Sequence, residues 1–311
     1  MKINRVIAIS VCGLLPVIAL SLLLACQPVE LVENGSVQVT DQLGRVVVLD
    51  KVPERIISLA PSNTEIVYAL GLADRLVAVT DYCDYPSEAK EKPSIGGFST
   101  PNIEEIVALS PDLVLATSRH EERIIPQLEE QGLTVFAVNP TTLDEVLITI
   151  SLVGEVAGVE KNAAELIADM RQRIKAVTDK TAKLSPAQRT NTFYVLWHDP
   201  LKTAGAGTLQ DELMQKAGGS NIGAEVTGYA NISLEVVLSE NPEVIIAGTS
   251  HGSNEDQVYQ FAATESRLGI TSARQSHRVH AIDSDLSSRA GPRIVEGLEQ
   301  MAVFIHPEMF K

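Results

Sequence analysis

The chain has 311 residues, of which 45% are hydrophobic and 4% aromatic, and its formal net charge is −15 at pH 7. Because domains usually contain about 100–150 residues, this length predicts two lobes rather than one core. A strongly acidic chain is a poor partner for nucleic acid, whose phosphates are contacted by Lys and Arg. We therefore expect no nucleic-acid partner.

The N-terminal segment has the layout of an export signal. Residues 1–5, MKINR, are basic, residues 6–25 are apolar, and the sequence LLAC ends at Cys26 before a polar stretch. This layout resembles a bacterial lipoprotein signal, which implies a signal peptide over residues 1–25, a lipid on Cys26 and a linker over residues 26–36. The alternative is a transmembrane anchor. Both interpretations place the rest of the chain outside the cytoplasmic membrane, where Cys83 would be the one thiol left.

Short apolar runs alternate with helical patterns over residues 37–140. Residues 37–49 predict a hairpin, and residues 55–60 predict a buried strand. A helix should follow, with Ser62 and Glu65 in capping-box spacing and Gly71 as its end. Three further apolar runs are separated by helical segments, so we expect an N-terminal α/β lobe with a parallel sheet.

A long helical pattern covers residues 141–185, with a possible break at Gly158. After it the alternation of strands and helices resumes and continues over residues 186–311. The sequence therefore predicts two α/β lobes with parallel sheets, separated by a helical connection.

An internal repeat supports this division. Residues 102–116 align without a gap to residues 233–247, and the alignment pairs Glu104 with Glu235. Each copy predicts a short helix, a turn that contains proline and a buried strand, which is the unit expected of two related lobes. Chance similarity between two ordinary helix–strand units is the alternative.

Polar and aromatic side chains follow several predicted strands. Because ligands of open α/β sheets bind outside the carboxyl ends of the strands, these residues are candidates for a site. In chain order they are Ser62, Tyr82, Tyr85, His120, Trp197, His198, His251, Asp283, Asp285 and Arg289. Phe98 and Tyr229 lie in loops just ahead of the repeated helices. So many aromatics at loops favour a large, flat and mostly apolar ligand.

Two other kinds of site fit parts of the pattern. Residues 248–252, GTSHG, match the nucleophile elbow of a serine hydrolase, with Ser250 as the nucleophile and Asp283 and His306 downstream. A metal site could use residues that each follow a strand, namely His120, His198, His251 and Asp283. No two of these are spaced as i, i+4. The alternative without a metal is that each histidine is a solvated loop residue.

Five segments together resemble one family of binding proteins. They are residues 55–71, the loop 81–98, residues 102–117, residues 197–222 and residues 288–308. In order and spacing they are similar to the iron-siderophore and cobalamin periplasmic-binding proteins of ABC importers, from about residue 54 to residue 311. The Tyr–x–Asp–Tyr–Pro loop at 82–86 is similar to the cobalamin-binding branch. The resemblance implies two α/β lobes joined by one long backbone helix, with the ligand between them.

The resemblance also implies a function and a site. The chain would be a non-enzymatic binding protein, expected to be monomeric and without a resident cofactor or metal, that delivers a corrinoid such as cobalamin to a permease. Tyr82, Phe98 and Tyr229 match aromatic contacts to the corrinoid, and the last two replace tryptophans. The expected ligand-binding residues are Ser62, Tyr82, Asp84, Tyr85, Phe98, Trp197, His198, Tyr229, Asp285 and Arg289.

The resemblance places Glu104 and Glu235 where the lobe tips dock onto the two transmembrane subunits of the permease. Haem or a ferric siderophore is the alternative ligand. A siderophore is often anionic and would favour cleft cations, for which Arg119, Arg289 and Arg293 are available.

Overall fold

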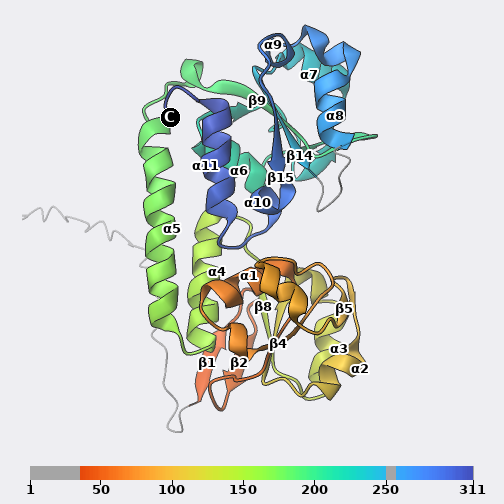
Figure 1. Ribbon diagram of the computed structural model, residues 1–311, viewed down its shortest axis with the longest axis vertical. Coiled ribbons are helices and arrows are strands. Elements are labelled where there is room, and N and C mark those ends of the chain that lie inside the picture. The colour runs from red at the N-terminus through yellow and green to blue at the C-terminus, as the bar shows by residue number, and fades with distance from the viewer. Residues whose placement is uncertain (1–35, 250–256, 311) are drawn as a thin grey trace, which may run out of the picture. The chain divides into compact units, whose positions relative to one another are not determined.

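Two four-stranded parallel sheets organise the chain in the computed structural model (Figure 1). The structure describes residues 36–249 and 257–310, and all of them belong to one compact unit. The predicted signal peptide, Cys26, Ser250 and His251 lie outside the described residues. The α/β fold class with two parallel sheets, expected from the alternation of apolar runs and helices, is confirmed.

The N-terminal sheet has the strand order β4-β3-β7-β8, with all neighbours parallel. The predicted hairpin is present as the antiparallel pair β1–β2. The elements of this lobe are β1 (Val37–Thr40), β2 (Val46–Leu49), β3 (Ile56–Ser58), α1 (Pro61–Ala69), β4 (Leu76–Val79), β5 (Gly96–Gly97), β6 (Thr100–Pro101), α2 (Ile103–Ala108), β7 (Leu113–Thr117), α3 (Ile124–Glu130) and β8 (Val135–Val138). Strands β3 and β8 are buried along their whole length, as expected for a sheet covered on both faces.

The C-terminal sheet has the strand order β12-β9-β14-β15, again parallel. A small antiparallel sheet, β10-β11-β13, adjoins it. The elements are β9 (Thr190–Val195), β10 (Trp197–His198), β11 (Leu201–Ala204), α6 (Leu209–Lys216), β12 (Gly219–Asn221), β13 (Tyr229–Asn231), α7 (Leu234–Glu240), β14 (Val244–Thr249), α8 (Gln257–Thr264), α9 (Ser272–Gln275), β15 (Val279–Asp283), α10 (Ser284–Ser288) and α11 (Ile294–Ile305).

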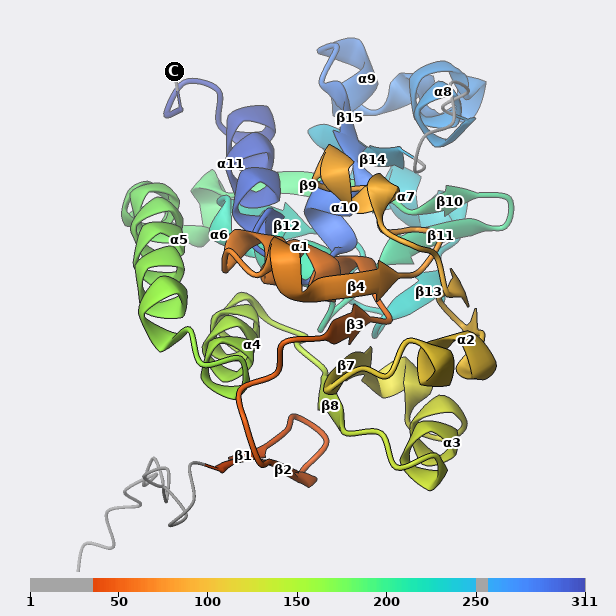
Figure 2. The same ribbon diagram turned by 60° about the horizontal axis from the view of Figure 1, so that its bottom comes forward.

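Two helices, rather than one continuous helix, connect the lobes. Helix α4 (Leu143–Val156) packs on the N-terminal lobe, and α5 (Glu160–Thr181) runs beside both α4 and α11 (Figures 1 and 2). The chain reverses at Gly158, whose φ of +67° is a conformation that favours glycine. At Gly154 a Cβ would lie only 2.5 Å from the Cβ of Ala163, so glycine there allows α4 and α5 to pack closely.

The internal repeat has a structural counterpart. Strands β7 and β14 each take the third position in their sheets, and each follows the repeated helix, α2 or α7. The turn residues Ser110 and Asn241, which the alignment pairs, both have positive φ, at 47° and 44°. Two units with the same strand position and the same unusual turn conformation support a genuine repeat over a chance similarity.

Within residues 36–249 and 257–310, no helix combines the length and the apolar character needed to cross a membrane.

Candidate functional site

A cavity of about 1410 Å³ lies where the two lobes meet. It is larger than the roughly 300–1,000 Å³ that is typical of sites for drug-sized ligands. Six predicted ligand residues line it, namely Ser62, Tyr82, Asp84, Phe98, Tyr229 and Arg289. Other lining residues come from the carboxyl ends of β7 and β8 and from the start of α6, so the cavity forms at the predicted edge of the sheets.

Three aromatic side chains reach the cavity from both lobes. Tyr82 and Phe98 belong to the segment between β4 and α2, and Tyr229 begins β13. Tyr82 and Tyr229 remain 61% and 53% exposed, although large apolar side chains usually bury more of their surface. Exposed aromatic faces on a cavity of this size are available for a ligand.

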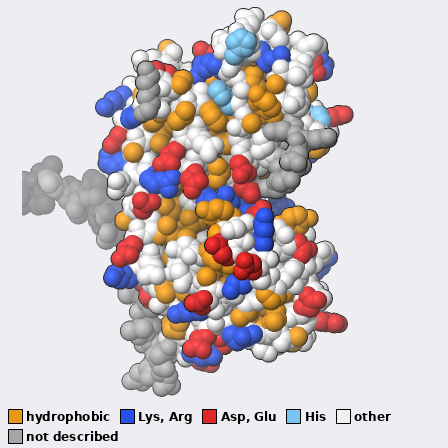
Figure 3. Space-filling view, in the orientation of Figure 1, with side chains coloured by type: hydrophobic (Ala, Val, Ile, Leu, Met, Phe, Trp, Pro, Cys, Tyr) orange, Lys and Arg blue, Asp and Glu red, His pale blue; other side chains and the backbone are white. Residues whose placement is uncertain are grey.

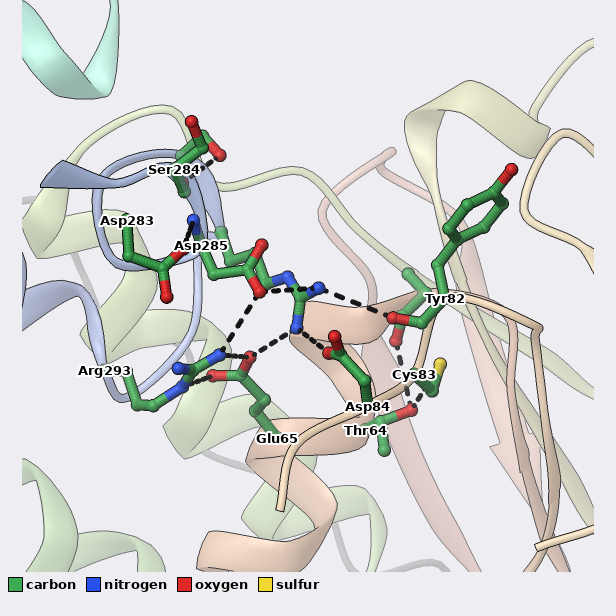
Figure 4. Close-up of polar contacts among 12 residues, drawn as sticks. Thr64, Glu65, Tyr82, Cys83, Asp84, Asp283, Ser284, Asp285 and Arg293 are labelled. Atoms are coloured by element: carbon green, nitrogen blue, oxygen red, sulfur yellow. Dashed lines mark hydrogen bonds and ion pairs between the residues drawn. The ribbon is translucent and has the colours of Figure 1, made fainter. Parts of the chain in front are cut away.

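A cluster of five charged side chains joins the lobes, and two of its members, Asp84 and Arg289, line the cavity (Figure 4). Its members are Glu65 and Asp84 from the N-terminal lobe and Asp285, Arg289 and Arg293 from the C-terminal lobe. Charged side chains also gather along the junction of the lobes on the face in Figure 3. In Figure 4 Glu65 lies between Arg293 and Asp84, and the Tyr82 ring points away from the cluster.

The contacts within this cluster are short. Arg293 donates to Glu65 through Nε at 3.0 Å and Nη2 at 2.6 Å. Arg289 donates through Nη1 to Glu65 at 3.1 Å and to Asp84 at 2.8 Å, and its Nη2 lies 2.9 Å from Asp285. Two of the three arginines that the sequence offers to an anionic ligand, Arg289 and Arg293, are therefore paired with protein carboxylates.

These pairings change the proton affinity of Asp84 and of both arginines. Burial alone would raise the pKa of Asp84, but the hydrogen bond and positive charge of Arg289 outweigh burial and hold that pKa below its usual value. Burial would lower the pKa of Arg289 and Arg293, but the facing carboxylates raise the pKa of each. Asp84, Arg289 and Arg293 are therefore charged at neutral pH.

The expected capping box of α1 is wrong. The helix begins at Pro61, its N-cap is Ala60, and no side chain caps it. Ser62 lines the cavity instead, and Glu65 points to the arginines of the other lobe. A sequence pattern of Ser and Glu three residues apart reports only local geometry, whereas the partners of Glu65 lie more than 220 residues away.

Two of the predicted ligand residues support the cluster rather than line the cavity. The ring of Tyr85 lies under the guanidinium of Arg293, 3.8 Å from its centroid, as a cation–π contact. Asp285 is only 6% exposed and pairs with Arg289 one turn away on the chain.

Trp197 and His198 are not among the described residues that line the cavity. The hairpin β10–β11 directs them toward α8, where the His198 ring lies 6.0 Å from Phe261 and 4.8 Å from Trp197. The indole N–H of Trp197 donates to the Asp199 carbonyl at 2.8 Å. Of the three ligand-binding residues expected from segments 197–198 and 229, Tyr229 alone lines the cavity among the described residues.

His120 is fully buried, in contrast to the solvated loop position expected of it. Among the described residues, no group of three or more His, Cys, Asp and Glu side chains is placed to hold a metal ion. Asp283 caps α10 by accepting from the Asp285 N–H, and His306 contacts Glu308 and the Gly218 carbonyl. Each has its own structural role.

Charges of both signs line the cavity. The carboxylates are Asp81, Asp84, Glu121 and Glu122, and the cations are Arg119, Arg123 and Arg289. Arg119 forms no ion pair with a described residue, whereas Arg289 is held by the cluster. A site of this composition carries no excess of positive charge.

Comparisons with known proteins agree with the fold. The family model described as "Periplasmic binding protein" matches residues 56–286. The ABC transporter substrate-binding lipoprotein YvrC of Bacillus subtilis is 35% identical over 88% of this chain and 87% of its own length. A vitamin B12-binding protein of Vibrio cholerae is 34% identical over 81% of this chain and 89% of its own length.

A solved structure leads to the same conclusion. The periplasmic vitamin B12-binding protein BtuF of Vibrio cholerae matches with a TM-score of 0.70 and 32% identity, over 84% of this chain and 99% of the solved chain. The chain belongs to the periplasmic binding protein family, whose members are non-enzymatic substrate-binding proteins of ABC transporters.

Proposed function

We propose that the protein captures cobalamin or a related corrinoid in the cavity between its lobes and delivers it to an ABC permease. The observation that carries this proposal is the cavity of about 1410 Å³ with aromatic side chains from both lobes. A corrinoid is a large macrocycle whose flat faces suit aromatic contacts and whose edge amides need hydrogen bonds. Ser62 and Asp84 supply polar groups on the same cavity.

The pairing of two arginines is the observation that favours a corrinoid over an anionic iron chelate, although Arg119 lines the cavity and forms no ion pair with a described residue. Arg289 and Arg293, which could hold the carboxylates of a siderophore or of haem, are already paired with Glu65, Asp84 and Asp285. Haem also needs an axial ligand such as Tyr or His. No histidine among the described residues lines the cavity, and the Tyr229 hydroxyl donates to Gln210 at 3.0 Å, so among these residues Tyr82 is the tyrosine left for that role.

Competition between the three ligand classes tests the proposal. The purified protein is mixed with cyanocobalamin, haemin and a ferric hydroxamate siderophore, passed through a desalting column, and its visible spectrum is recorded. The expected result is the cobalamin spectrum on the protein at one equivalent. Retention of haemin or of the siderophore without cobalamin would refute the corrinoid assignment.

We further propose that the protein is anchored on the outer face of the cell membrane by a lipid on Cys26. Two observations support this anchor: residues 1–26 run from a basic start through an apolar stretch to the motif LLAC, and the chain is similar to a lipoprotein. Replacing Cys26 by Ser should move the protein from the membrane fraction to the soluble fraction. Continued sedimentation of Cys26→Ser with the membranes would instead indicate a transmembrane anchor.

Docking onto the permease is assigned to Glu104 and Glu235. Both are the second residue of a short helix, behind the N-caps Asn102 and Ser233, and both are exposed. Neither forms an ion pair with a described residue, so each charge is available to a partner. Two equivalent acids, one per lobe, suit two arginine-bearing subunits of a symmetric permease.

A charge-removal experiment separates docking from helix capping, because a carboxylate in a first turn gains about 0.3–1 kcal/mol without any partner. The double variant Glu104→Gln and Glu235→Gln should bind ligand normally but lose uptake and permease binding. The control is the double variant Glu105→Gln and Glu240→Gln, which removes two charges from the same helices. Wild-type uptake by the first variant would disprove docking through these residues.

A further inference from the structure

The aromatic walls of the cavity occupy equivalent positions of the internal repeat. Phe98 lies four residues before the N-cap Asn102, and Tyr229 lies four residues before the N-cap Ser233. Each is contacted by a polar side chain that is fully buried, His120 in the N-terminal lobe and Gln210 in the C-terminal lobe. Neither buried residue lines the cavity among the described residues.

His120 fixes both the backbone and the ring of Phe98. Its Nδ1 accepts from the Thr117 backbone N–H at 3.0 Å, and its Nε2 is 2.8 Å from the Phe98 carbonyl oxygen. Because a backbone N–H can only donate, Nδ1 must be the unprotonated nitrogen, and Nε2 carries the proton that is donated to Phe98. The two rings also meet edge to face, with centroids 5.0 Å apart at 67°.

Gln210 holds Tyr229 through its hydroxyl. The Tyr229 O–H donates to Gln210 Oε1 at 3.0 Å, and Gln210 lies at the start of α6. Tyr194 interacts with Gln210 and is fully buried, and burial raises the pKa of Tyr194 to about 12, even though Ser287 and Gln210 partly oppose the rise. The Tyr194 hydroxyl is therefore neutral and hydrogen-bonded to Ser287 at 2.9 Å, so the support under Tyr229 is uncharged and buried.

We propose that His120 and Gln210 are positioning residues for the ligand, because they hold the two aromatic walls of the cavity in their binding orientation. The proposal rests on the proposed function and adds to it the side chains that preorganise the site. An exposed aromatic ring without such a support would sample several rotamers and would have to be ordered when the ligand binds. Each lobe uses a different residue for the same task at the same repeat position.

The test for His120 uses cyanocobalamin binding and a double-mutant cycle. His120→Asn keeps an acceptor for Thr117 but loses the donor to Phe98. Its affinity for cyanocobalamin should fall up to about tenfold, because the Phe98 ring must then be ordered when the ligand binds. His120→Gln places an amide N–H near the position of Nε2 and should restore most of the affinity. In a Phe98→Ala background, His120→Asn should cost less than about twofold.

The matching cycle for the other lobe combines Gln210→Met with Tyr229→Phe, which keeps both side-chain volumes and deletes their hydrogen bond. Each single change should weaken binding about threefold to tenfold. The double variant should bind no more weakly than the single variant that has the lower affinity. Additive losses in either cycle, or unchanged affinity in His120→Asn and Gln210→Met, would overturn the proposal.

A measurement without ligand separates this proposal from the proposed function. With Trp197→Phe and Phe98→Trp the chain has one indole, at position 98, whose time-resolved fluorescence anisotropy reports motion of that wall. His120→Asn should increase the amplitude of its fast decay, and His120→Gln should not. Failure of the wild type to bind cyanocobalamin refutes the proposed function alone, whereas an unchanged anisotropy decay in His120→Asn refutes positioning.

Discussion

Glu65 is expected to be the strongest single polar link between the lobes. Its side chain is 2% exposed and accepts three hydrogen bonds, two from Arg293 and one from Arg289. Glu65→Gln removes the negative charge and turns an amide NH₂ toward a guanidinium. The change therefore breaks a buried ion pair while the shape of the side chain is almost unchanged.

The expected loss is about 3 kcal/mol of unfolding free energy. Removing one partner of a buried pair costs about 3–5 kcal/mol, because the remaining charge stays buried without compensation. The value for Glu65→Gln should lie at the lower end, since Arg289 keeps Asp84 at 2.8 Å and Asp285 at 2.9 Å. Glutamine also keeps one oxygen that can accept from Arg293.

Urea unfolding of the wild type and of two variants measures this loss. The matched control is Glu299→Gln, because Glu299 accepts two hydrogen bonds from Arg173, at 2.9 and 2.6 Å, but is 41% exposed. The control should lose at most about 1 kcal/mol, as exposed pairs do. Equal losses for Glu65→Gln and Glu299→Gln would contradict the argument from burial.

Three further results are expected. Burial lowers the pKa of His120 from 6.5, so the stability that its neutral form contributes is fully present above pH 6.5 and is lost as the pH falls toward the lowered pKa. The melting temperature of His120→Gln should therefore fall less below pH 6.5 than that of the wild type. His277→Gln, which changes an exposed histidine, is the control. Ser110→Gly should raise the unfolding free energy by about 0.5–1 kcal/mol in urea, because φ is +47° at this position, and a loss of stability would contradict the backbone argument. Burial raises the pKa of the Cys83 thiol, so a thiol reagent should modify it far more slowly in the native protein than in urea, and equal rates would contradict its burial.

The sequence predicted the features that depend on local patterns. Alternating apolar runs define both sheets, and the repeat at residues 102–116 and 233–247 placed Phe98 and Tyr229 before equivalent helices. Ser62 and Tyr82, which are candidates because they follow predicted strands, line the cavity. These predictions succeed because strand burial and helix starts are determined by residues a few positions apart.

Long-range partners could not be predicted in the same way. Glu65 matches a capping pattern, but its arginines come from the other lobe and become neighbours only in the folded chain. Trp197 follows a strand like the cavity residues, yet the β10–β11 hairpin turns it toward α8. His120 has the sequence position of a loop histidine, but in the fold it contacts Phe98, a residue 22 positions away in the chain.

Equilibrium dialysis of cyanocobalamin against the wild type and the double variant Phe98→Ala and Tyr229→Ala tests the central claim most directly. The account predicts one site in the wild type and a loss of at least about 2 kcal/mol in the double variant, or about 30-fold in Kd, because both aromatic walls are removed. Trp197→Phe, which changes an aromatic outside the cavity, should bind like the wild type. Unchanged affinity in the double variant, or loss of affinity in Trp197→Phe alone, would contradict a corrinoid site between these walls.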